Sequence, residues 1–154
     1  MTFDDAFEKL IGHEGGYSND PRDRGGETMY GISKRAFPLE DIKGMTLDRA
    51  KAIYKKEYWG PAGCDAVPPS AKFDLFDTAV NSGVNTAIRL LQKAVGETAD
   101  GILGPRTLQA VQSMPAERLK ARYNAQRLLF MTEAVTWPVH GKGWVRRVAA
   151  NLLG

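Results

Sequence analysis

The sequence contains very few of the residues that usually build metal sites and disulfides. Its 154 residues include one cysteine, Cys64, and two histidines, His13 and His140. A single cysteine excludes an intramolecular disulfide and any zinc site made of Cys-x-x-Cys pairs. The two histidines lie far apart and do not form a His-Glu-x-x-His pattern. We therefore expect neither a metal nor another cofactor.

Long hydrophobic runs are also absent. No stretch of about 18 apolar residues occurs, so we expect no membrane-spanning helix and no stable membrane insertion. Residues 1–10 lack a basic segment followed by an apolar one, and so do not resemble a secretory signal peptide. Internal repeats and low-complexity tracts are missing too. With 43% hydrophobic and 25% charged residues, the composition is typical of a folded globular protein.

Acidic residues become scarce in the last third of the chain. Residues 104–154 carry eight basic and two acidic residues, whereas the whole chain has a net charge of +3. Such a surplus indicates an anionic partner, for example nucleic acid, a membrane surface or a cell wall. It is equally consistent with a solvated basic helix face. Because no DNA- or RNA-binding motif occurs, we expect no nucleic-acid partner.

Apolar residues recur with a helical period along most of the chain. Thr2 and Thr46 stand where N-caps are expected. A segment that is apolar almost all round, residues 70–81, is expected to be buried at the centre. The expected helices cover residues 3–11, 46–59, 70–81, 87–95 and 115–136, with another beginning near Pro105 and a last one over 145–153.

The end of the chain combines helix formers with residues that interrupt helices. Pro138 is expected to end the long helix over 115–136. The last helix has an apolar stripe that includes Val145 and Val148, and Arg146 and Arg147 are expected on its other side.

The segment over residues 15–31 differs from the rest, because five glycines and one proline fall within 17 positions. Such a segment cannot form a regular helix and predicts a structured loop, a short hairpin or a small sheet. The sequence therefore predicts a mainly α fold, with a helical body and a small irregular or β-hairpin insert near the N-terminus.

Carboxyl groups are concentrated around this glycine-rich segment. Glu14 follows the end of the first helix, where desolvation and the negative helix end both raise a carboxyl pKa. Asp20 and Asp23 stand in loop contexts that favour the ionised form. A protonated and an ionised carboxyl together suit acid–base hydrolysis. However, a glutamate after a helix is common, and the two aspartates equally fit a turn and a surface ion pair.

The same segment resembles the signature of glycoside hydrolase family 108, a group of lysozyme-like N-acetylmuramidases that includes phage endolysins and secretion activator proteins. The family pattern is Glu-Gly-Gly-Tyr, then Asp-Pro, then Gly-Gly-x-Thr-x-Tyr-Gly-Ile. The matching residues are Glu14-Gly15-Gly16-Tyr17, Asp20-Pro21 and Gly25-Gly26-Glu27-Thr28-Met29-Tyr30-Gly31-Ile32. We therefore expect a lysozyme-like helical body.

The resemblance implies an endolysin-type muramidase that hydrolyses the bond between N-acetylmuramic acid and N-acetylglucosamine in peptidoglycan. Glu14 would be the general acid. Asp23 and Thr28 would hold the attacking water, with Asp20 as the alternative aspartate. Further residues expected to bind the substrate are Tyr17, Asp20, Tyr30 and Asn81, although the two tyrosines equally fit core packing.

The second half resembles the companion module of the family, a predicted peptidoglycan-binding domain. The residues that carry this likeness are 76–96, 100–111 and the closing Gly143-Trp144 with Arg147. We expect a muramidase lobe over 1–96 and a peptidoglycan-binding-like part over 97–154, packed as one compact unit. For Trp144, packing of the last helix is the expected role.

The expected partners are peptidoglycan glycan strands. We expect a monomer that is made in the bacterial host cytoplasm without a signal peptide. It would act on the cell wall or periplasm after release, through a holin or another route. Two alternatives stay open: a lytic transglycosylase, and a non-catalytic protein that binds peptidoglycan or assists secretion.

Overall fold

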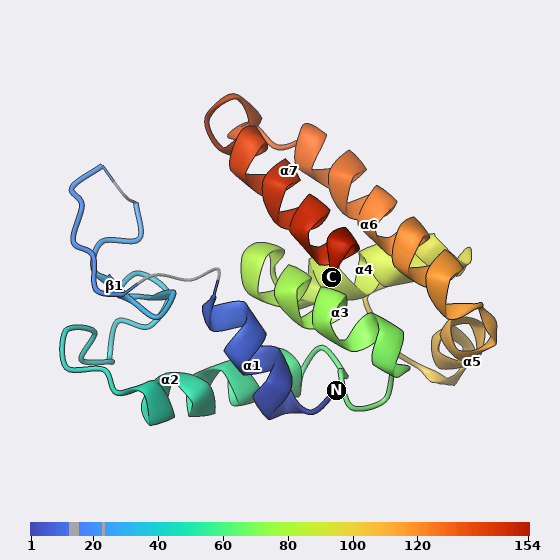
Figure 1. Cartoon of the computed structure of the whole chain (residues 1–154), viewed down its shortest axis with the longest axis horizontal. Helices are drawn as coiled ribbons and strands as arrows, with labels where there is room; N and C mark the ends of the chain where they lie inside the picture. The colour runs from blue at the N-terminus through green and yellow to red at the C-terminus, as the bar shows by residue number, and fades with distance from the viewer. Residues whose placement is uncertain (13–15, 23) are drawn as a thin grey trace. The chain divides into compact units, whose positions relative to one another are not determined.

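The computed structural model describes residues 1–12, 16–22 and 24–154. Over these residues it contains seven α-helices, one short π-helix and one two-stranded antiparallel sheet (Figure 1). The predicted mainly α fold, with a small hairpin near the N-terminus, is confirmed. The chain divides into two compact units, one comprising Thr2–Glu57 and the other Met1 together with Tyr58–Gly154. No helix of the described residues is long and apolar enough to cross a bilayer.

Two helices with side-chain caps frame the N-terminal unit. Helix α1 spans Phe3–Ile11, and the Thr2 hydroxyl accepts a hydrogen bond from the backbone N–H of Asp5. The Asp5 carboxylate in turn accepts from the Thr2 backbone, which completes a capping box. Helix α2 spans Leu47–Tyr54 and begins at the Thr46 cap. Both caps occur where the sequence predicts them.

The helix predicted over 46–59 is not uniform. Its first part is α2, and its last five residues form the π-helix η1 over Lys55–Trp59. In a π-helix each turn is wider than in an α-helix, so the helix continues but its side chains are rotated about the helix axis. Apolar periodicity alone cannot distinguish the two geometries, since both place neighbouring turns on one face.

Five helices make up the C-terminal unit. Helix α3 packs against α4 and α6, α4 also contacts α5 and α6, and α6 and α7 lie side by side (Figure 1). The bounds are Pro69–Ser82 for α3, Val84–Val95 for α4, Pro105–Ser113 for α5, Ala116–Thr132 for α6 and Trp137–Leu153 for α7.

Helix α3 is buried, as its apolar sequence predicts. Phe73, Leu75 and Phe76 are at most 6% exposed. Two carboxylates are also buried in this helix, Asp74 at 3% and Asp77 at 0% exposed. Buried charges are costly unless they are paired, so this helix needs polar partners from its neighbours.

Those partners come from α6 and α7. The Asp74 carboxylate accepts a hydrogen bond from the Asn124 amide at 3.0 Å. Asp77 lies 3.1 Å from the fully buried Arg127 and accepts from Arg147 Nε at 2.9 Å. The expectation that Arg147 lies on the outer side of its helix is therefore wrong. Its guanidinium reaches inward because an unpaired Asp77 could not remain charged in the core.

The end of the long helix also differs from the prediction. Helix α6 ends at Thr132 and not near residue 136, and Pro138 lies in the first turn of α7. Proline is tolerated there because the first N–H groups of a helix have no intrahelical partner. Helix α7 continues through Gly141, where an added Cβ would lie 2.7 Å from the Trp137 ring. This glycine allows a close approach and does not interrupt the helix.

Candidate functional site

In the described part of the glycine-rich segment, Thr28 is paired with other segments of backbone on both sides. Strand β1, Thr28–Met29, pairs with β2, Ile32–Ser33. On its other side the Thr28 backbone exchanges two hydrogen bonds with Ser18, of 2.9 and 2.8 Å. The backbone of the predicted water-holding threonine is thus fixed from both sides. Its hydroxyl makes no hydrogen bond to any other described residue.

A two-residue turn joins the strands. Tyr30 and Gly31 have φ values of 50° and 77°, which is the pattern of a type I′ turn. The Tyr30 carbonyl accepts a hydrogen bond of 2.6 Å from the Tyr54 hydroxyl of α2. Tyr54 is buried and its ring contacts Phe7 of α1 edge-to-face, with ring centroids 5.6 Å apart. The hairpin turn is therefore anchored to both helices of its unit.

Tyr17 lies exposed beside this hairpin. Its hydroxyl donates a hydrogen bond of 3.0 Å to the Glu27 carboxylate, and this bond raises the Tyr17 pKa. The residue is 42% exposed, so the side chain is accessible to solvent. The sequence gives no sign of the bond between Tyr17 and Glu27, since ten positions separate the two residues.

Asp20 is paired with Arg22, its one side-chain partner among the described residues. Both carboxylate oxygens accept hydrogen bonds from the Arg22 side chain, and the Arg22 backbone N–H donates to Oδ1 at 2.9 Å. These bonds lower the Asp20 pKa, which agrees with the ionised carboxylate expected from the sequence. Such a pairing two positions apart is typical of a side chain that organises a turn.

The two predicted acid–base residues, Glu14 and Asp23, lie outside the described residues. The described residues before Glu14 end α1 at Ile11, with Gly12 as its C-cap. The roles of Glu14, Asp23 and Thr28 in catalysis, and of the residues expected to bind substrate, stay predictions.

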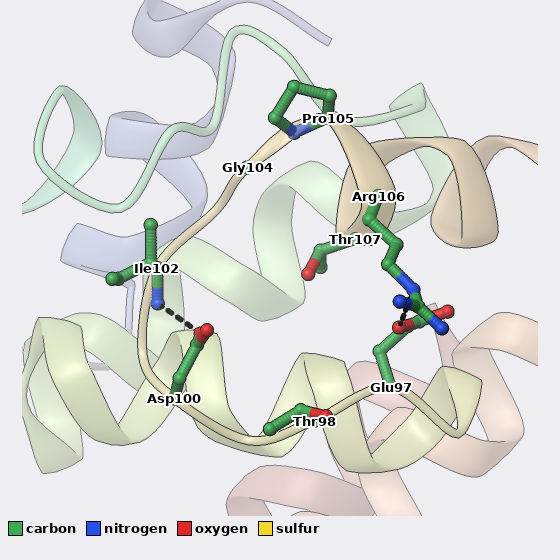
Figure 2. A pocket seen from close by; sticks show the side chains of 8 residues that line it. All are labelled: Glu97, Thr98, Asp100, Ile102, Gly104, Pro105, Arg106 and Thr107. Atoms are coloured by element: carbon green, nitrogen blue, oxygen red, sulfur yellow. Dashed lines mark hydrogen bonds and ion pairs between the residues drawn. The ribbon is translucent and has the colours of Figure 1, made fainter.

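Asn81 belongs to the C-terminal unit. It lies exposed near the end of α3 and lines a hollow of about 210 Å³ together with residues of α6 and α7. The loop between α4 and α5 forms a second hollow, of about 310 Å³ (Figure 2). Its lining consists of Glu97, Thr98, Asp100, Ile102, Gly104, Pro105, Arg106 and Thr107.

The buried amide of Gln92 holds this second loop in shape. Its Nε2 donates to Asp100 Oδ1 at 2.8 Å and to the Ile102 carbonyl at 3.0 Å, and its Oε1 accepts from the Gly101 N–H. Asp100 also accepts from the Ile102 N–H, as Figure 2 shows. The sequence predicts a turn at Asp100-Gly101 but gives no sign that a glutamine of α4 stabilises it.

Charged groups lie along the same hollow. Arg106 Nε is 3.1 Å from the Glu97 carboxylate, and the arginine is 89% exposed (Figure 2). The hollow therefore presents both signs of charge, whereas the hollow at Asn81 is lined by uncharged residues. Among the residues that the structure describes, no three potential metal ligands come together.

Comparisons with known proteins identify both halves of the chain. Residues 7–83 match a family model described as Glycosyl hydrolase 108, and residues 86–149 match one described as Predicted Peptidoglycan domain. The structure resembles that of SagA from Brucella abortus with a TM-score of 0.89 and 33% sequence identity, over 97% of this chain and 91% of that chain. A search of the curated proteins found no match.

The chain belongs to the glycosyl hydrolase 108 family. Together with the second module, this makes it a lysozyme-like protein that acts on peptidoglycan, with peptidoglycan as a partner. The family predicted from the glycine-rich signature is confirmed. The domain boundary predicted between residues 96 and 97 stays a prediction.

Proposed function

We propose that the protein is an N-acetylmuramidase of the endolysin type, which hydrolyses the bond between N-acetylmuramic acid and N-acetylglucosamine in peptidoglycan. The observation that carries the proposal is the match of residues 7–83 to a glycosyl hydrolase family, a region that includes Glu14. The sequence-based expectation that Glu14 is the general acid belongs to this proposal.

In the proposed reaction Glu14 donates its proton to the glycosidic oxygen as the bond from that oxygen to the sugar C1 breaks. A water molecule forms the new bond to C1, and its proton passes to an aspartate. The Thr28 hydroxyl holds the attacking water in this step. The Thr28 backbone is held on both sides, which limits the movement of that hydroxyl. Asp23 is the preferred aspartate, because both Asp20 oxygens already accept hydrogen bonds from Arg22.

A second candidate is a protein that binds peptidoglycan without cutting it. The match of residues 86–149 to a predicted peptidoglycan domain favours this function. The hollow between α4 and α5 lies in that region and carries the negative Glu97 and the positive Arg106. Both could pair with charged groups of the peptide stems. The two candidates differ in one measurable property, the release of new reducing ends.

The test compares Glu14→Gln with Glu8→Gln on purified peptidoglycan. Glu8 is an exposed residue of α1, so its substitution controls for the loss of one carboxylate from the same region. Loss of general acid catalysis should lower the rate of reducing-end release by about 10²–10⁴-fold in Glu14→Gln only. Circular dichroism should show an unchanged helix content in both variants.

Three outcomes would contradict the proposal. Full activity of Glu14→Gln would exclude its role as the acid. Binding to peptidoglycan without reducing ends, by the unsubstituted protein, would favour the second candidate. Products lighter by one water would identify a lytic transglycosylase, because the muramic acid then closes on itself without admitting water.

A further inference from the structure

The hollow at the end of α3 combines an apolar lining with aromatic side chains. Met131 is 2% exposed, whereas the neighbouring Phe130 is 37% exposed although it is large and apolar. Trp144 of α7 is half-buried. The full lining is Asn81, Ser82, Phe130, Met131, Ala134 and Trp144.

Contacts within α7 hold the Trp144 indole in place. Its ring centroid lies 5.7 Å from that of His140 and 6.2 Å from that of Trp137. The three residues occupy adjoining turns of one helix. Trp144 is thus a preorganised aromatic surface, which reduces the entropy lost when a ligand binds.

Polar groups of the lining have unused hydrogen-bonding capacity. Within the described part of the chain, neither the Asn81 amide nor the Ser82 hydroxyl nor the Trp144 indole N–H bonds to another residue. The amide alone offers two donors and one acceptor. A few polar groups beside an apolar lining are characteristic of small-molecule sites.

The uncharged lining limits which ligands this hollow can bind. None of the six lining residues is charged, so a carboxylate or ammonium group would lose its hydration without gaining an ionic partner. The carboxylates of peptidoglycan peptide stems are therefore poor ligands for this hollow. A neutral sugar with an amide substituent fits, because its C–H face suits aromatic rings and its amide suits Asn81.

We propose that this hollow is a binding site for a neutral N-acetylated hexosamine, the N-acetylglucosamine unit of the glycan strand. Phe130 and Trp144 contact the apolar face of the sugar, and Asn81 pairs with its acetamido group. The choice of a glycan ligand rests on the proposed function, but the site is defined by its own lining. It holds the strand and takes no part in proton transfer.

The test measures binding of chitotriose, a soluble oligomer of N-acetylglucosamine, to the full chain carrying Glu14→Gln so that the ligand is not cleaved. Isothermal titration gives the affinity, and the indole N–H resonances of the three tryptophans report the location. We expect the Trp144 resonance to shift on titration. Cellotriose, which lacks the acetamido group, should bind at least tenfold more weakly.

Two substitutions and one control locate the site. Phe130→Ala and Asn81→Ala should each weaken chitotriose binding by about tenfold, equivalent to about 1.4 kcal/mol. Leu129→Ala removes a neighbouring apolar side chain that is 59% exposed and does not line the hollow, and it should bind chitotriose unchanged. Trp144→Phe keeps a ring but removes the indole N–H, and should weaken binding less than Phe130→Ala.

Equal affinities for chitotriose and cellotriose would overturn the proposal, as would unchanged binding in both alanine variants. The hydrolysis of peptidoglycan by the unsubstituted protein is measured separately. A protein that binds chitotriose through Asn81 and Phe130 but releases no reducing ends would retain this site and refute the muramidase. A protein that releases reducing ends while these variants bind chitotriose normally would refute the site and retain the muramidase.

Discussion

Replacement of Asp77 by asparagine tests the buried polar centre of the C-terminal unit. The substitution preserves the shape of the side chain and removes its charge. Asp77 Oδ2 lies 3.1 Å from Arg127 Nη2 and accepts from the Asn151 amide at 2.8 Å, while Oδ1 accepts from Arg147 Nε at 2.9 Å. Asp77 and Arg127 are both fully buried.

The expected loss follows from the charge that remains. Within the described residues, the Arg127 guanidinium donates no hydrogen bond and depends on its ion pair with Asp77. Removal of one partner of a buried ion pair typically costs about 3–5 kcal/mol. Arg147 adds less, since its side chain is 15% exposed. A loss of about 3–5 kcal/mol corresponds to a fall in Tm of about 6–20 °C for a chain of this length.

Urea denaturation followed by circular dichroism measures this free energy, and Asp74→Asn is the matched control. Burial raises the Asp74 pKa, against the opposing hydrogen bond from Asn124. An uncharged amide should therefore be tolerated at position 74, with a change below about 1 kcal/mol, because it can keep the bond to Asn124. A loss below about 1 kcal/mol in Asp77→Asn, or equal losses in both variants, would refute the reasoning.

The pH dependence gives an independent check. Burial alone would raise the Asp77 pKa, but the hydrogen bond from Arg147 and the charges of Arg127 and Arg147 outweigh it, and the pKa is lowered. The stabilisation is therefore complete above the unfolded pKa of about 3.9 and disappears as the pH falls through the folded pKa. The difference in unfolding free energy between the unsubstituted protein and Asp77→Asn should therefore become smaller below about pH 4.

Three further substitutions or reactions test local features. Burial raises the pKa of Cys64 to about 12, so iodoacetamide at pH 8 should label the native thiol far more slowly than the unfolded one. Gly63→Ala should lower the unfolding free energy by about 1–3 kcal/mol, because Gly63 has a φ of 73° and its Cβ would lie 2.4 Å from Leu103. Tyr54→Phe should cost about 1 kcal/mol in urea denaturation, since it removes the bond to the Tyr30 carbonyl.

Helices were predictable where local chemistry determines them. The caps Thr2 and Thr46 begin α1 and α2, because a hydroxyl can satisfy a helix N–H within three positions. The apolar character of residues 70–81 likewise predicts the burial of α3. These signals act over a few residues and are therefore visible in a single sequence.

The start of α7 was not predictable by the same means. Pro138 and Gly141 are both residues that commonly end helices, yet α7 contains both. The proline is tolerated because of its place in the first turn, and the glycine is needed because the Trp137 ring lies against it. Only the packing of α7 distinguishes these cases from a helix end.

In the candidate site, too, local sequence signals were predictive and contacts between distant residues were not. The order of residues from Glu14 to Ile32 predicts the family, because a long specific motif carries its own information. The pairing of Tyr17 with Glu27 and the buried Gln92 amide were not predicted. Each depends on partners that only the folded backbone brings together.

The buried ion pair and the proposed sugar site are linked by helix geometry. Trp144 and Arg147 are three positions apart on α7, and Asp77 and Asn81 are four positions apart on α3, so each pair occupies one face of its helix. The bond from Arg147 to Asp77 therefore fixes the rotation of α7 against α3. That rotation places Trp144 in the same hollow as Asn81. Burying these charges costs free energy, but the directional bond between Arg147 and Asp77 gives the hollow one defined arrangement. An apolar contact at position 147 would fix that arrangement less strictly.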